Sequence, residues 1–112
     1  MTAFRILLAT IFVVVFVYTM IVGLSHGWGL LPIFFTDISG MTWRGQFNMD
    51  FASYLTLSGL WLAWRKNFSP AGLGLGILGF FGGILVLAPY LLYATFAAKG
   101  DMREVLLGKA RA

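Results

Sequence analysis

The stretch AFRILLATIFVVVFVYTMIVGL, residues 3–24, decides the fold class, because it holds 22 residues with a single charge, Arg5, near its start. A helix of this length rises about 33 Å, enough to cross the roughly 30 Å hydrocarbon core of a bilayer. The stretch therefore predicts a membrane-spanning helix. A signal peptide is the competing interpretation, since Gly23 and Ser25 are small residues suited to cleavage, but signal cores usually hold only about 7 to 15 residues.

The composition of the whole chain points the same way. Of its 112 residues, 60% are hydrophobic and 11% are charged, whereas soluble domains carry roughly 25% charged residues. The absence of cysteine excludes disulfides, thiolate metal sites and cysteine nucleophiles. The net charge of +4 suits anionic lipid headgroups. We expect no nucleic-acid partner, because the basic residues are scattered at the ends of apolar segments and form no stripe.

Two further apolar runs complete the expected architecture. Residues 47–64 are followed at once by Arg65 and Lys66, and residues 70–98 hold 29 positions without a charge. Both runs are long enough to span. Pro70 suits the first turn of a helix, and we expect Pro89 to bend the third span.

The segment between the first two spans is too short to cross a membrane. Residues 28–38 are apolar in part and are interrupted by Pro32, which favours an interfacial or re-entrant segment. Residues 99–112 carry mixed charges and read as a juxtamembrane tail. The sequence thus predicts an all-α integral membrane protein, a single domain of residues 1–112 with three transmembrane helices.

Three full crossings would distribute the polar and aromatic markers over two sides of the membrane. The first side would hold Arg5, Trp61, Trp64, Arg65 and Lys66. The second side would hold Trp28, Trp43, Arg44, Tyr90, Tyr93, Lys99, Arg103, Lys109 and Arg111. The count of basic residues favours the second side as cytoplasmic, but the first helix and the short RKNFS loop favour the opposite. We expect a multi-pass protein of the inner membrane with a cytoplasmic N-terminus.

Small residues recur on one face of two of the expected helices. The third run carries Gly72, Gly76, Gly79 and Gly83, and the second carries Ala52, Thr56, Gly59 and Ala63. Spacings of four, three and four place each set on one helical face. Small side chains let membrane helices approach closely. We expect the two faces to meet each other, or one of them to meet a neighbouring chain.

The stretch WRGQFNMDF, residues 43–51, concentrates polar side chains at the start of the second span. We expect Asn48 to be the N-cap and Asp50 to lie in the first turn, near the positive end of the helix dipole. A solvated membrane boundary explains most of this polarity. The functional alternative is a polar entrance that binds a headgroup, a quinone carbonyl or a partner chain, with Arg44 and Asp50 as a pair. Its candidate residues are His26, Asp37, Arg44, Gln46, Asn48 and Asp50.

No pattern indicates catalysis or a metal site. The stretch GLGLGILG lacks the strand and acidic partner of a nucleotide-binding loop. His26 alone cannot supply two axial ligands to a haem, so a second chain would be needed. We expect no enzyme activity, no cofactor and no metal.

The segment from QFNMDF to WLAWR resembles small, uncharacterised bacterial membrane proteins of three or four helices. The resemblance covers about the last two thirds of the chain and implies no activity. Our leading hypothesis is a structural or regulatory accessory subunit, a homo-oligomer or part of a larger complex, surrounded by membrane lipids. The alternatives are a small oligomeric transporter or channel entered around Asp50, and a lipid-directed enzyme using His26 and Asp50 as acid and base.

Overall fold

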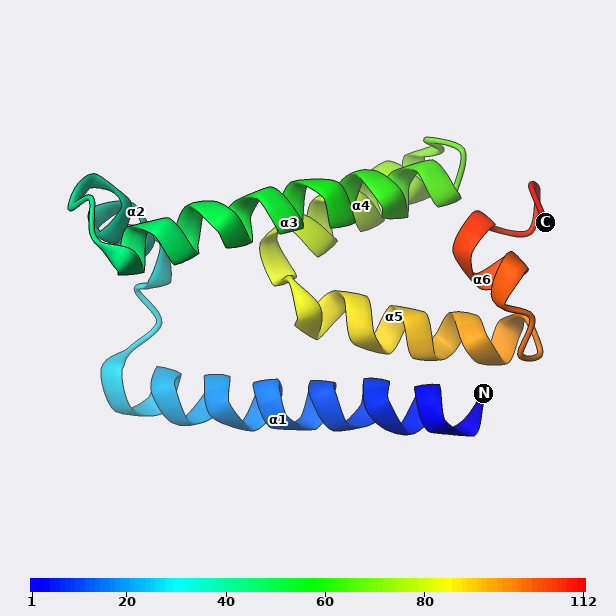
Figure 1. Cartoon of the computed structure of the whole chain (residues 1–112), viewed down its shortest axis with the longest axis horizontal. Helices are drawn as coiled ribbons and strands as arrows, with labels where there is room; N and C mark the ends of the chain where they lie inside the picture. Colours follow the sequence, from blue (N-terminus) through cyan, green and yellow to red (C-terminus); the bar gives the residue numbers. More distant parts are fainter.

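The structure is a computed structural model that describes residues 1–112, and it contains six helices and no strand. The prediction of an all-α chain is confirmed. The helices are α1 Thr2–His26, α2 Leu30–Ser39, α3 Trp43–Arg65, α4 Pro70–Gly82, α5 Ile84–Ala97 and α6 Met102–Leu107. In Figure 1, α1 and α3 form two long outer rods, with α5 lying between them and α4 packed along the back of α3.

Helix α1 is the one helix whose length and composition suit a membrane crossing. A signal sequence would have the same properties. Only 11% of its most apolar window is buried, whereas the core helix of a globular protein is mostly buried. Helix α3 has 23 residues, but polar side chains near its start lower its mean hydropathy. Helices α2, α4 and α5 are shorter, with 10, 13 and 14 residues.

The third expected span is not one continuous helix, and its break lies at Gly83 and not at Pro89. The chain breaks at Gly83, which adopts φ 59° and ψ −136°, a conformation that residues with a side chain avoid. Pro89 lies inside α5. After the break, α5 runs back toward the end at which α4 began, so α4 and α5 form a helical hairpin (Figure 1). Each arm is about 20 Å long, which is too short to cross a bilayer.

The tip of this hairpin lies against the middle of α3. A side chain at Gly83 would contact Phe51 and Leu55 at 3.4 Å. Leu55 is ten residues before Arg65, or about 15 Å of helix. The hairpin therefore extends about half the length of α3.

The hairpin also changes where the tail lies. Gly100 is next to Met1, and both ends of the sequence lie at the same end of the molecule (Figure 1). The expected separation of the basic residues was therefore wrong. Seven of the eight lie at this end, which we call the basic end: Arg5, Arg65, Lys66, Lys99, Arg103, Lys109 and Arg111. Arg44 lies at the opposite end of α3.

The start of α3 also differs from expectation. The helix begins at Trp43 with Thr42 as its N-cap residue, so Asn48 is not a cap and Asp50 is not in the first turn. The preceding segment forms the helix α2, which packs on α3. Contact is close at Gly45, where a side chain would collide with the carbonyl oxygen of Asp37. This packing extends α3 beyond the apolar run.

Candidate functional site

The small-residue faces of α3 and α4 meet within the chain. A Cβ atom added to Gly76 would lie 2.7 Å from the carbonyl oxygen of Gly59, and one added to Gly59 would lie 2.8 Å from that of Gly76. Ala63 lies beside this crossing, 3.2 Å from the same position on Gly76. The two backbones are therefore in direct contact, which is possible because neither glycine carries a side chain.

The remaining small residues extend this seam unequally. Gly72 packs near Ala63 and Lys66, and Gly79 receives the buried side chain of Leu62. Gly83 is the hairpin turn and not part of the α4 face. Thr56 is exposed, and its hydroxyl donates to the carbonyl oxygen of Ala52 one turn earlier. The seam is thus centred on Gly59, Ala63 and Gly76, and these positions are covered inside the chain.

The expected polar entrance does not form a single cluster. Arg44 faces Asp37 at 3.9 Å, with the Arg44 side chain 79% exposed, and not Asp50. The amide of Asn48 donates to the carbonyl oxygen of Phe34 at 3.2 Å and joins α3 to α2. Gln46 is exposed. The Asp50 side chain is exposed and makes no hydrogen bond or ion pair within the chain.

His26 lies at the end of α1, beside a cavity of about 300 Å³ between α1 and α2. None of the other polar-entrance residues lines it. Trp28 folds back so that its ring occupies the space beside Gly23. The structure therefore separates His26 from the α2–α3 contacts that hold Asp37, Arg44 and Asn48.

The densest polar contacts lie instead at the basic end, around Arg65. Its guanidinium donates to the hydroxyl of Tyr90 at 2.6 Å and to the carbonyl oxygens of Val105 and Glu104 at 2.7 and 3.3 Å. Arg65 thereby ties the end of α3 to α5 and α6. The expectation that Tyr90 lies on the side opposite Arg65 was wrong, because the hairpin returns α5 to this end.

Other side chains hold the tail in the same way. Trp61 donates its indole N–H to the carbonyl oxygen of Leu106 at 3.0 Å. Arg111 donates to the carbonyl oxygen of Trp64 at 2.6 Å and lies 4.0 Å from the centre of its ring. On the other flank, Arg5 binds the hydroxyl and carbonyl oxygens of Thr95. The carbonyl oxygen of Leu106 has no backbone donor, as is usual at a helix end, whereas those of Trp64 and Thr95 also accept from the N–H groups of Asn67 and Gly100.

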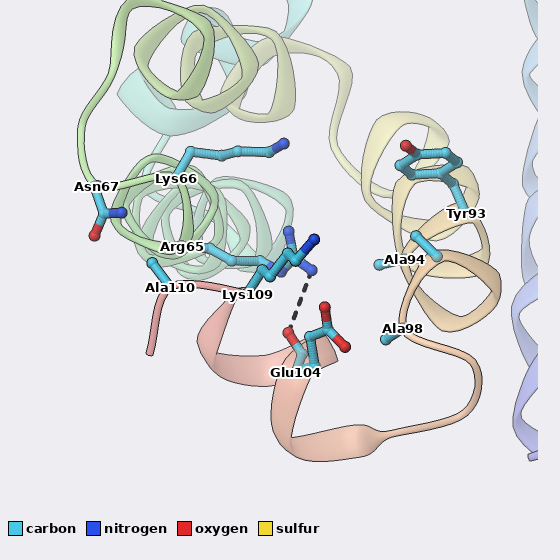
Figure 2. A pocket seen from close by; sticks show the side chains of 10 residues that line it. Arg65, Lys66, Asn67, Tyr93, Ala94, Ala98, Glu104, Lys109 and Ala110 are labelled. Atoms are coloured by element: carbon cyan, nitrogen blue, oxygen red, sulfur yellow. Dashed lines mark hydrogen bonds between the residues drawn. The ribbon is translucent and has the colours of Figure 1, made fainter. Parts of the chain in front are cut away.

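A cavity of about 390 Å³ opens beside these contacts, between the end of α3, the start of the following loop, α5 and the tail. Figure 2 shows Arg65, Lys66 and Lys109 directed into it from one side, with Tyr93 and Ala94 of α5 and the C-cap residue Ala98 opposite. Glu104 is the one acidic residue in the lining. We call this space the basic cavity.

Sequence reasoning missed the basic end because it assumed one continuous third helix. The adjacent Gly82 and Gly83 in the middle of the run were a usable signal, since paired glycines favour a turn. With the chain reversed there, the tail returns to Arg65.

The fold and the site define an all-α protein with one long apolar helix, a half-length helical hairpin and a basic end built from arginine contacts. No group of three or more His, Cys, Asp or Glu side chains is placed to hold a metal ion. Comparison with protein-family models, curated proteins and solved structures found no match.

Proposed function

We propose that the chain is a non-catalytic integral membrane protein in which α1 and α3 cross the bilayer and α4–α5 is a re-entrant hairpin. Helices α1 and α3 would rise about 37 and 35 Å, sufficient for a core of about 30 Å. The hairpin tip packs on the middle of α3 and would therefore reach about half the depth of the bilayer. Irregular backbone at that depth is tolerated when protein covers it, and Phe51 and Leu55 lie beside Gly83.

The clustering of basic residues supports a cytoplasmic basic end. Positive residues near membrane spans stay preferentially on the cytoplasmic side. With two crossings, three arguments favour a cytoplasmic N-terminus: the positions of the basic residues, the influence of the first helix and the short RKNFS loop. We therefore propose a protein of the inner membrane whose N-terminus and tail both lie on the cytoplasmic side.

Single cysteines test this arrangement without background, because the chain has none. We expect Thr2→Cys and Ala112→Cys to react with a membrane-impermeant maleimide from the same, cytoplasmic side, and Ser39→Cys to react only from the other side. All three positions are exposed. Labelling of intact cells and of inverted membrane vesicles gives the measurement. Reaction of residues 2 and 112 from opposite sides would indicate a third complete crossing and contradict the hairpin.

The function that we propose is that of an accessory subunit, and the observation that carries it is Asp50. This carboxylate lies seven residues, about 10 Å, inside α3 from Trp43. It is exposed and has no partner within the chain. Ionisable groups at membrane depth usually face protein and pair with another group. A second chain that donates a hydrogen bond or a positive charge would supply what Asp50 lacks.

The surroundings of Asp50 fit a helix interface. Phe47, Tyr54 and Leu57 lie on the same face of α3 at spacings of three and four, and they are 68%, 70% and 65% exposed. The seam between α3 and α4 is used inside the chain, so assembly through those glycines is no longer our proposal. The face of Phe47, Asp50, Tyr54 and Leu57, which we call the Asp50 face, takes that role.

Photocrosslinking in native membranes tests the Asp50 face. A photoreactive residue at Phe47 or Leu57 is expected to give one discrete protein adduct, reduced severalfold by Asp50→Asn because the charge of the proposed contact with the partner is lost. The matched control is the same residue at Val14 of α1, which is 60% exposed. Differently tagged copies distinguish a homo-oligomer from another partner. Lipid-sized adducts alone at all three positions would contradict the accessory role.

A small oligomeric transporter or channel is the alternative, and it has less support. Its entrance residues are divided between the α2–α3 contacts, the exposed Asp50 and the separate His26 cavity. The hairpin tip meets Phe51 and Leu55, which offer no polar path. A flux into proteoliposomes that Asp50→Asn abolishes would favour this alternative over the accessory subunit.

A further inference from the structure

We propose that the basic cavity binds the phosphate group of an anionic glycerophospholipid. This inference rests on the membrane arrangement proposed above, which puts the cavity at the cytoplasmic boundary of the bilayer. It does not depend on Asp50, which lies 15 residues before Arg65 on α3. The chemistry recognised is a phosphate ester, and the setting of the cavity points to a lipid as its source.

The charge of the lining favours an anion. Arg65, Lys66 and Lys109 contribute three positive charges and Glu104 one negative charge, a formal excess of two. None of these cations lies within 4.0 Å of a carboxylate, since Arg44 and Asp37 form the one such pair in the chain. Like charges directed into one space repel each other, and a bound phosphate would relieve that repulsion.

The donors are also available. A guanidinium has five N–H groups, and Arg65 uses three of them on Tyr90, Val105 and Glu104. Two remain. The ammonium groups of Lys66 and Lys109 donate to no protein acceptor, and Figure 2 shows both side chains directed into the cavity. Because α3, α5 and α6 already fix Arg65, little side-chain entropy remains to be lost when it binds an anion.

The rest of the lining suits a lipid. Ala94, Ala97 and Ala98 form an apolar wall, and Tyr93 beside them has an exposed ring. The volume of about 390 Å³ lies within the usual range of ligand sites, about 300 to 1,000 Å³. Basic pockets between membrane helices on the cytoplasmic side suit anionic headgroups. A glycerol phosphate would meet the cations while its acyl chains follow the apolar surface of α5.

The test uses the full chain in a neutral detergent, with native mass spectrometry of bound phosphatidylglycerol and phosphatidylcholine. We expect phosphatidylglycerol to bind preferentially, and Lys66→Gln with Lys109→Gln to weaken it roughly thirtyfold, as the loss of two charges near a headgroup predicts. Lys66→Arg with Lys109→Arg should retain binding. The matched control is Lys99→Gln with Arg103→Gln, which removes the same charge outside the cavity and should change affinity less than threefold. Unaltered circular dichroism and thermal unfolding show that each variant is folded.

Three results would overturn the proposal. Equal weakening by the two glutamine pairs would show general attraction to a basic surface. Both lipids carry a phosphate diester, so equal binding would show that the net negative charge of the headgroup is not recognised. Displacement of the lipid by glycerol 3-phosphate at the same concentration would identify a soluble phosphate ester as the ligand. If any of these occurs while the cysteine labelling matches the re-entrant arrangement, the lipid site fails and the proposed topology stands.

Discussion

Replacing Gly76 by leucine is expected to separate α4 from α3 and to lower the free energy of unfolding by about 3 kcal/mol or more. A Cβ atom at this position would lie 2.7 Å from the carbonyl oxygen of Gly59, and backbone cannot move aside as the end of a flexible side chain can. The separation would also expose Leu62, which is fully buried. Unfolding of the purified protein by dodecyl sulfate, followed by circular dichroism, measures the loss.

Gly74 provides the matched control on the same helix. It is exposed, and a Cβ atom there meets nothing within 4 Å. Gly74→Leu should therefore leave stability unchanged or raise it by up to about 1 kcal/mol, because leucine favours helix more than glycine does. Equal stability of Gly76→Leu and Gly74→Leu would show that the glycine seam does not hold α3 and α4 together.

Arg65→Met is expected to release the tail from the helix ends. Methionine keeps much of the length of the side chain but removes the three hydrogen bonds to Tyr90, Val105 and Glu104. We expect stability to fall by about 2 to 4 kcal/mol, because hydrogen bonds from a charged donor are among the stronger ones. The segment that contains α6 should then become a substrate for proteolysis. Mass spectrometry after brief digestion with proteinase K would detect its removal at least tenfold faster than in the native chain.

Arg103→Met is the control for charge and for position in the tail. The Arg103 side chain is exposed and makes no hydrogen bond, although its backbone N–H donates to the carboxylate of Asp101. Its loss should leave the rate of digestion nearly unchanged. Similar digestion of Arg65→Met, Arg103→Met and the native chain would contradict the role given to Arg65.

Features of the fold that depend on neighbouring residues could be predicted from the sequence, and features that depend on contacts between distant segments could not. Composition and the uninterrupted run of residues 3–24 sufficed for an all-α chain and for a long apolar first helix, because both depend on local hydrophobicity. The period of the small residues placed Gly59 and Gly76 on faces suited to close packing. The cap at Asn48 failed because α2, an element formed elsewhere in the chain, packs on α3 and extends its start to Trp43.

The prediction that the N-terminus and the tail lie on opposite sides failed for a different reason. Pro89 was the more obvious breaker, yet a proline bends a helix without reversing it, and a glycine with positive φ can reverse the chain. One such residue, Gly83, decides whether the tail lies near Arg44 or near Arg65. No local pattern in the tail distinguishes these two outcomes.

The sequence by itself determined that the chain is helical, is rich in apolar surface and has two faces of small residues. Those properties follow from the side chains and their spacing along one helix. Only the tertiary structure decided that the glycine seam is used within the chain, that seven basic residues share one end, and that Arg65, Lys66 and Lys109 line one cavity. These depend on the direction of the backbone after a single turn, which sets contacts between residues tens of positions apart.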